Sequence, residues 1–205
     1  RALIAATTTR GKGMAAEDHE MVSIYPHSDE DREALMTNGR ECVLMWATQD
    51  GWPVGVVHAY VWHQGSVWIT FAAHRHRCAA IRRDPRVSVV VSGRTNDAPE
   101  CPNGAITVKG RGIIHEDRET KEWFYGALSS KGRATEEAAE RFYKILDSPL
   151  RVVLQVVPEK WISYDSSKAA RDRAGELREE EKGPRLSSDA ERMNKERERR
   201  GLDPR

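Results

Sequence analysis

Two arginines, Arg75 and Arg77, stand where a predicted strand gives way to a predicted basic helix. The apolar run Val67–Phe71 predicts the strand, and a helix from about residue 74 should end at the Asp-Pro pair 84–85. A helix start offers unpaired backbone N–H groups and the positive end of the helix dipole, and a guanidinium adds paired hydrogen bonds. The pattern therefore predicts a phosphate site, with an ordinary basic surface helix as the alternative.

The motifs around this segment resemble those of one known family over about residues 40–165. They are the turn QDGWP at 49–53, the loop RHR at 75–77, the helix exit RRDPRV at 82–87, the strand VKGRG at 108–112 and the segment PEKWISYD at 158–165. In this order they resemble the FMN-binding split barrels, the pyridoxamine 5'-phosphate oxidase-like family with its deazaflavin-using relatives. The loop has Arg-His-Arg where the family usually has Ser-Arg-Lys, which keeps the positive charge that a phosphate needs.

The resemblance implies a mainly β (α+β) fold, an antiparallel split β-barrel with flanking helices that acts as a homodimer. It implies a flavin-dependent oxidoreductase that transfers a hydride between bound FMN and a small organic substrate, with no catalytic acid or base assigned. One alternative is a reductase that uses the deazaflavin F-420, for whose longer charged tail Arg82, Arg83 and Lys109 are available. The other is a non-catalytic flavin or haem binding protein.

The same resemblance assigns residues to the cofactor. The strand after the first turn would run along the flavin ring, and the next strand and the helix start would hold the ring edge and the phosphate. The expected cofactor-binding residues are Val56, Val57, His58, Ala59, Thr70, Phe71, Arg75, His76, Arg77 and Trp161. His58 is the only polar side chain in its run, and a core histidine explains it as well as a ring contact does.

A metal site is not expected from the alternating residues His74, His76 and Cys78. On an extended strand three such side chains would point the same way, but a helix start splays them. No second ligand pair follows at zinc spacing.

Composition limits the possible partners. The chain has 205 residues, 39% of them hydrophobic, and a net charge of +1, so no global field favours nucleic acid or a membrane surface. Its three cysteines include no C-x-x-C pair, which is typical of a reducing compartment, and no apolar run approaches the ~20 residues of a membrane span or forms a secretory signal. We expect a cytoplasmic protein with a small-molecule substrate.

Three segments are expected along the chain: an N-terminal arm at 1–26, the barrel domain at 27–165 and a charged tail at 166–205. The tail holds 12 basic and 10 acidic residues and no aromatic residue. Such a composition favours disorder, although helices with i,i+4 ion pairs or a subunit arm are also compatible with it. Removing residues 170–205 should then cost little stability. The predicted strands are 41–48, 54–62, 66–71, 87–91, 105–115 and 151–157, and the predicted helices are 29–36, 74–83, 119–128 and 134–146.

Overall fold

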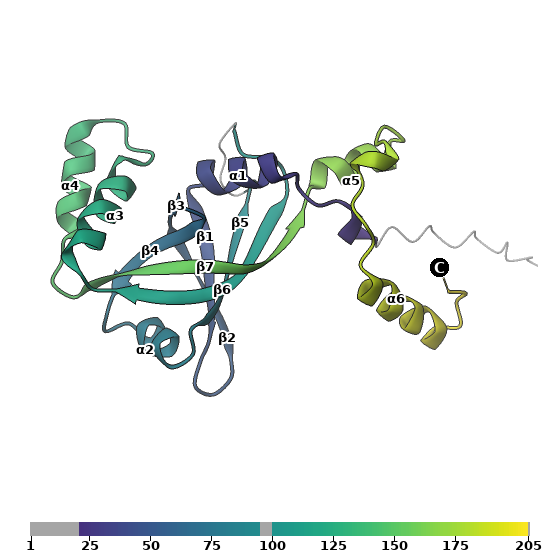
Figure 1. The fold of residues 1–205 in the computed structure, drawn as a ribbon, viewed down its shortest axis with the longest axis horizontal. Coiled ribbons are helices and arrows are strands. Elements are labelled where there is room, and N and C mark those ends of the chain that lie inside the picture. The colour runs from purple at the N-terminus through teal and green to yellow at the C-terminus, as the bar shows by residue number, and fades with distance from the viewer. Residues whose placement is uncertain (1–20, 95–99, 205) are drawn as a thin grey trace, which may run out of the picture.

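The computed structural model describes residues 21–94 and 100–204, and its centre is one antiparallel sheet. Seven strands follow the order β2-β1-β5-β6-β7-β4-β3, and the sheet curls (Figure 1). Inward side chains of all seven strands contribute to one core. The strands are β1 (Glu41–Ala47), β2 (Pro53–Ala59), β3 (Val61–His63), β4 (Ser66–Ala72), β5 (Arg86–Ser92), β6 (Ala105–His115) and β7 (Arg151–Tyr164). The expected antiparallel barrel with flanking helices is confirmed.

Helices flank this barrel on several sides. They are α1 (Asp29–Asn38), α2 (His76–Arg83), α3 (Arg118–Ser130), α4 (Glu136–Leu146), α5 (Ser166–Arg173) and α6 (Ser187–Arg199), with short 3₁₀ turns η1 (Val22–Ile24) and η2 (Glu179–Glu181). Helix α1 lies at one end of the barrel and α2 at the opposite end, while α3 and α4 form a pair to one side (Figure 1). Within the described ranges, none of these helices has the length and apolar character needed to cross a membrane.

Local sequence explains several element boundaries. Ser28 caps α1 by accepting a hydrogen bond from the Asp31 N–H, as expected for a serine before an acidic first turn. The strand predicted at 54–62 is instead two strands that break at Tyr60. Tyr60 is fully buried, and its hydroxyl donates to the Met36 carbonyl of α1, 2.7 Å away, which turns the chain from the β1 side of the barrel to the β4 side.

Two further boundaries differ from the sequence expectation. Helix α2 starts at His76, two residues later than expected, because Arg75 adopts the extended N-cap conformation. Strand β7 continues through Pro158 to Tyr164. Its pairing with β4 stops at Val156, so the missing N–H of Pro158 faces no partner on that side.

Two apolar clusters lie on the two faces of the sheet. The barrel interior combines residues of α1 and α2 with inward strand residues such as Leu44, Ile69 and Leu154. The outer face of β4 and β7 packs under α3, where Phe124 and Tyr125 are fully buried. Because the inward residues repeat every second position, the alternation of each strand sets which side chains can reach the interior.

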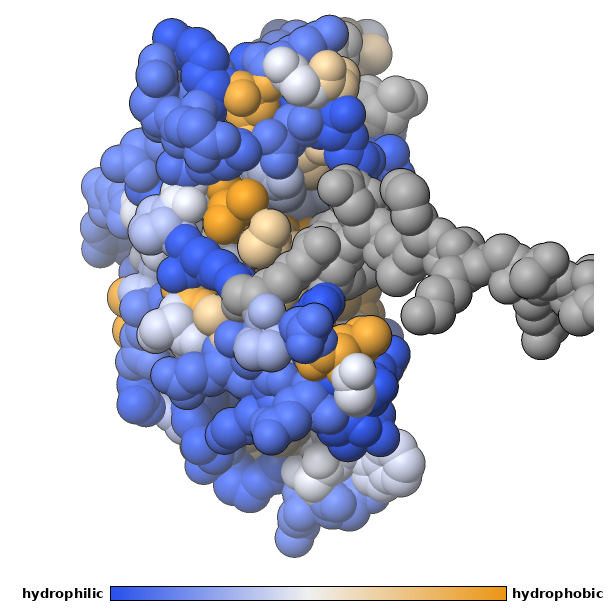
Figure 2. Space-filling view, turned by 90° about the vertical axis from the view of Figure 1, so that its right-hand side faces the viewer, coloured by the Kyte–Doolittle hydropathy of each residue, from blue (hydrophilic) through white to orange (hydrophobic). Residues whose placement is uncertain are grey.

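The described part of the C-terminal tail contains α5, η2 and α6, whereas its composition favoured disorder and only allowed helices. Leu177 packs with Tyr25 and Ala169 in a third small cluster, and the Tyr25 hydroxyl donates to Asp172, 2.5 Å away. Helix α6 buries none of its residues. The face of the molecule on the C-terminal side is mostly hydrophilic (Figure 2). The division of the chain into an arm, a barrel domain and a tail stays a prediction, and residues 1–20 of the arm lie outside the described residues.

Two truncations should separate the roles of the tail. Removing residues 187–205 should leave the melting temperature unchanged, because α6 buries nothing. Removing residues 170–205 should lower it, contrary to the expectation from composition, because the deletion takes away Leu177. The burial of one leucine contributes roughly 1.5–3 kcal/mol, and each kcal/mol is worth about 2–4 °C in a chain of this size. Circular dichroism melts measure both effects. Equal melting temperatures for the two truncated proteins would show that the Leu177 cluster contributes nothing.

Candidate functional site

Arg77 is the centre of a cluster at the α2 end of the barrel. One guanidinium nitrogen lies 2.8 Å from Nε2 of His58 on β2. The guanidinium carbon lies 5.6 Å from the ring centroids of both Trp46 and Phe71, within the range of cation–π attraction. The start of α2 is thereby tied to β1, β2 and β4. Three residues that the sequence predicted at the cofactor, His58, Phe71 and Arg77, are brought together here.

The contact with Arg77 fixes the protonation of His58. A guanidinium only donates hydrogen bonds, so Nε2 of His58 accepts and the single ring proton lies on Nδ1. Burial, together with the positive charge of Arg77, lowers the pKa of His58 to about 4. At neutral pH His58 is therefore an uncharged acceptor that orients the guanidinium and leaves its charge uncompensated.

Among the described residues, the charge at the start of α2 has no acidic partner. In the described part of the chain, Arg77 forms no ion pair, and its pKa is lowered by burial and by neighbouring Arg75. Helix α2 has no side-chain cap and no acidic residue in its first turn. A bare helix start beside a partly buried guanidinium favours a bound anion. Arg82 differs, because it pairs with Glu116 at the far end of the helix.

The other predicted residues of β2 and β4 lie on two faces. Val56 lies on the inner face and packs against the barrel core. Val57 and Ala59 are exposed on the outer face. The Thr70 hydroxyl donates to the Val152 carbonyl, 2.7 Å away, on the side of the sheet that α3 covers. The structure does not bring Thr70 to the Arg77 cluster.

Trp161 lies at the opposite end of the barrel from Arg77. Its ring meets Trp62 edge-on with centroids 5.8 Å apart, and the guanidinium of Arg32 on α1 lies 5.1 Å from its centroid. Arg75 and His76 are exposed at the start of α2. Hollows of about 540 and 610 Å³ lie on the outer face of β1, β5 and β6 and beside α5, and neither is lined by Arg75, Arg77 or His58.

A family model described as pyridoxamine 5'-phosphate oxidase matches residues 29–165, more than half of the chain. The chain belongs to the pyridoxamine 5'-phosphate oxidase family. The match begins at the first residue of α1 and ends at the N-cap of α5. It therefore covers the barrel, α1 to α4 and the Arg77 cluster.

Solved structures share the fold at low sequence identity. The conserved hypothetical protein Rv2991 from Mycobacterium tuberculosis has a TM-score of 0.58 and 21% identity, over 70% of this chain and 87% of that one. HutZ, the haem storage protein from Vibrio cholerae, has a TM-score of 0.51 and 14% identity, over 66% of this chain and 92% of that one. No curated protein matches the chain.

One residue of the cluster, Trp46, was not predicted from the sequence. Trp46 on β1 is buried and lies beside the Arg77 guanidinium. The signal was present: Cys42, Leu44 and Trp46 alternate along one strand, which predicts a shared inner face. What the sequence did not show is that the first turn of α2 reaches this face.

The alternating residues His74, His76 and Cys78 do not share a surface. Both histidines are exposed, whereas Cys78 is fully buried in the barrel core and burial raises the pKa of its thiol. The group of potential metal ligands in the described residues is a different one, His27, Asp31 and Asp165.

The lowered pKa of His58 predicts a pH dependence of stability. An imidazole in the unfolded chain has a pKa near 6.5, above its folded value of about 4. Between these pH values the unfolded chain binds more protons, so the free energy of unfolding should fall as the pH falls from about 6.5 to 4. His58→Gln keeps an acceptor for Arg77 and should lose less stability over this range. Urea unfolding at pH 7 and pH 5 measures the difference, and identical losses in both proteins would contradict it.

Proposed function

We propose that the chain is a flavin-dependent oxidoreductase that transfers a hydride between bound FMN and a small organic substrate. The observation that carries the proposal is the Arg77 cluster, a partly buried cation that has no acidic partner in residues 21–94 and 100–204 and lies beside a helix start without a side-chain cap. It lies in a barrel whose family is named for an oxidase of a phosphorylated substrate. The alternative with F-420 uses the same positive charge for a cofactor that also carries phosphate.

The residues present fit a group that carries a phosphate. Arg77 would hold the phosphate together with the N–H groups of the first turn of α2, and Arg75 would add charge from the exposed side. His58 would keep the guanidinium oriented. Trp46 and Phe71 exclude water beneath it, which strengthens the attraction between the guanidinium and an anion.

When bound, a flavin or deazaflavin supplies the hydride chemistry, and the chain binds, orients and shields it. The main chain of β2, next to His58, would offer fixed N–H and C=O groups to the ring. No side chain of the cluster supplies a proton at neutral pH, because His58 is already neutral and its Nδ1–H can only donate a hydrogen bond. The substrate would then be one that needs no strong acid from the protein.

The proposal includes a second copy of the chain. One row of side chains crosses five strands on the outer face, in register: Val57, Val43, Val90, Thr107 and Ile162. Val57 and Ile162 are 59% and 48% exposed, although their neighbours in the row are mostly apolar. An apolar row of this kind favours an interface. A partner copy over this face would also complete a cofactor site that a single chain leaves open.

Arg77→Ala should weaken binding of the cofactor by about tenfold or more, because losing a charge-assisted hydrogen bond costs roughly 1.5–3 kcal/mol. Arg82→Ala is the matched control, since Arg82 lies on the same helix and pairs with Glu116. Fluorescence titration with FMN and with F-420 measures both variants and separates the two cofactors.

The outcomes of this titration are distinct. Stronger binding of F-420 than of FMN would favour the deazaflavin alternative. If neither cofactor binds and added haem gives a Soret band, the chain is the haem-binding alternative. Binding of both cofactors by Arg77→Ala as by the parent protein would show that the phosphate site lies elsewhere.

Val57→Lys should dissociate the proposed dimer, because it places a charge on the most exposed apolar side chain of the row. Ile145→Lys on α4 is the control, since Ile145 is as exposed as Val57 but lies outside the row. Sedimentation velocity at micromolar concentration measures the molecular mass. A monomeric parent protein with cofactor bound would contradict the dimer without contradicting the cofactor site.

A further inference from the structure

His27 is buried without a hydrogen-bond partner for its ring. Only 7% of the residue is exposed, and in the described part of the chain neither ring nitrogen has a partner in good hydrogen-bond geometry, although the Tyr164 backbone lies close to the ring. Its backbone is fixed, because the His27 N–H donates to the Ser163 hydroxyl on β7, 3.2 Å away. A buried polar atom without a partner costs free energy, so a native structure retains one where something else satisfies it.

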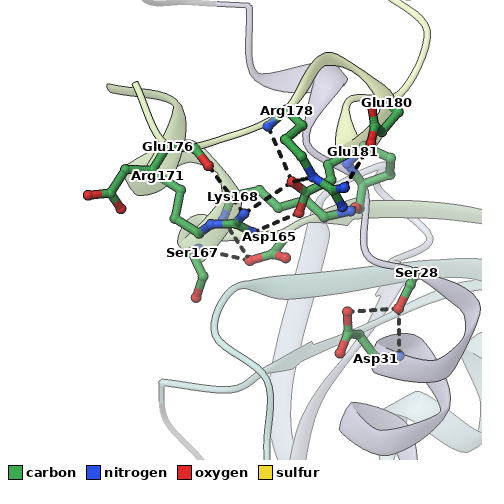
Figure 3. Close-up of polar contacts among 11 residues, drawn as sticks. Ser28, Asp31, Asp165, Ser167, Lys168, Arg171, Glu176, Arg178, Glu180 and Glu181 are labelled. Atoms are coloured by element: carbon green, nitrogen blue, oxygen red, sulfur yellow. Dashed lines mark hydrogen bonds and ion pairs between the residues drawn. The ribbon is translucent and has the colours of Figure 1, made fainter. Parts of the chain in front are cut away.

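Two carboxylates face this imidazole. Asp31 lies in the first turn of α1, and buried Asp165 is the N-cap of α5. One ligand atom from each of the three residues lies within 4.8 Å of the other two. Ligands about 2.1 Å from a shared ion lie at most about 4.2 Å apart, so small side-chain rotations bring all three into range. Figure 3 shows the two carboxylates at the starts of their helices.

Hydrogen bonds orient each carboxylate and leave one oxygen available. Oδ1 of Asp165 accepts from the N–H groups of Ser167 and Lys168, at 2.8 and 3.2 Å. Oδ2 of Asp31 accepts from the Ser28 hydroxyl, at 2.7 Å (Figure 3). Partners of this kind, one shell outside a metal, fix the direction of its ligands.

The backbone around His27 is adapted to the ring. Gly104 has φ +118°, and a Cβ there would lie 2.0 Å from the Tyr164 carbonyl oxygen and 3.0 Å from Nε2 of His27. Only glycine therefore fits against the imidazole. Next to the two carboxylates lies a polar hollow of about 350 Å³, through which an ion and its waters can enter.

The local charges also favour a cation. The Lys168 ammonium lies nearby and donates to the Pro26 carbonyl, 2.9 Å away. It is one positive charge beside the two negative charges of Asp31 and Asp165. Arg171 also lies near Asp165, but its ion pair is with Glu181, 2.9 Å away, so it compensates the two carboxylates only in part. The balance at the three residues is therefore negative.

We propose that His27, Asp31 and Asp165 bind one divalent transition-metal ion that joins the barrel to its C-terminal segment. One imidazole nitrogen and two carboxylate oxygens suit Zn²⁺, Mn²⁺ or Fe²⁺, whereas Ca²⁺ and Mg²⁺ prefer oxygen ligands alone. The three ligands precede α1, lie in α1 and cap α5, so the ion fixes the junction between these elements. The site is at the α1 end of the barrel and is separate from the Arg77 cluster.

The test uses the full chain, treated with a chelator and dialysed. Co²⁺ is titrated by visible absorption, and Zn²⁺ and Mn²⁺ are titrated by calorimetry. We expect one ion per chain, and His27→Gln and Asp31→Asn should each lower the affinity at least about tenfold, since even changes outside the first ligand shell cost that much. Asp29→Asn changes a 91% exposed carboxylate in the same turn of α1, and His74→Gln changes an exposed histidine. Both controls should bind as the parent does.

Two results would overturn the proposal. One is the absence of stoichiometric binding of all three ions at millimolar concentration. The other is unchanged affinity in both Asp31→Asn and Asp165→Asn. Asp165→Asn keeps the cap of α5, because asparagine caps helices as well as aspartate does. Asp31 is only partly buried, so its variant decides the question even if His27→Gln fails to fold. None of these measurements involves the flavin site.

Discussion

The pairing of β6 with β7 is the constraint on which the rest of the structure depends. It is the longest ladder of the sheet, from Ala105 with Tyr164 to His115 with Val153, and it is interrupted by one irregularity between Lys109 and Gly110. A Cβ at Gly110 would lie 2.2 Å from the Val157 carbonyl oxygen, so the strands can approach there only because this residue is glycine. Beyond this point β7 no longer pairs with β4, and the barrel is split.

The irregularity between Lys109 and Gly110 divides β7 into two halves, and each half positions a different end of the barrel. On one side of it, β7 pairs with β4 and positions Phe71 beside Arg77, so the start of α2 is held against the barrel wall. On the other side, β7 carries Trp161 toward α1 and then ends at Asp165, which caps α5. Both proposed sites are thus positioned by β7, which pairs with β6 along nearly its whole length and with β4 over its first half only.

Much of the barrel could be predicted from the sequence, because its signals are local. Ser28 before an acidic turn predicts the start of α1, and the alternation in β1 predicts which residues face inward. The failures have non-local causes. The break at Tyr60 depends on a hydrogen bond to a carbonyl of α1, and the continuation of β7 through Pro158 depends on where β4 stops. The order in the tail depends on the burial of Leu177 against Tyr25, which is distant in sequence.

The candidate sites, too, could be predicted only in part from the sequence. The family resemblance indicated Arg77 and His58, and the structure brings these two residues together. Trp161 and Thr70 lie away from them, because strand pairing decides both the position of a residue along the barrel and the face on which it lies. The proposed metal ligands gave no sequence signal, since His27 and Asp31 are far from Asp165 along the chain. Both sites have a net charge that the neighbouring described side chains do not balance. In the Arg77 cluster an uncharged histidine leaves the guanidinium uncompensated, whereas at His27 two carboxylates outweigh one lysine, so each site favours a ligand of the opposite sign.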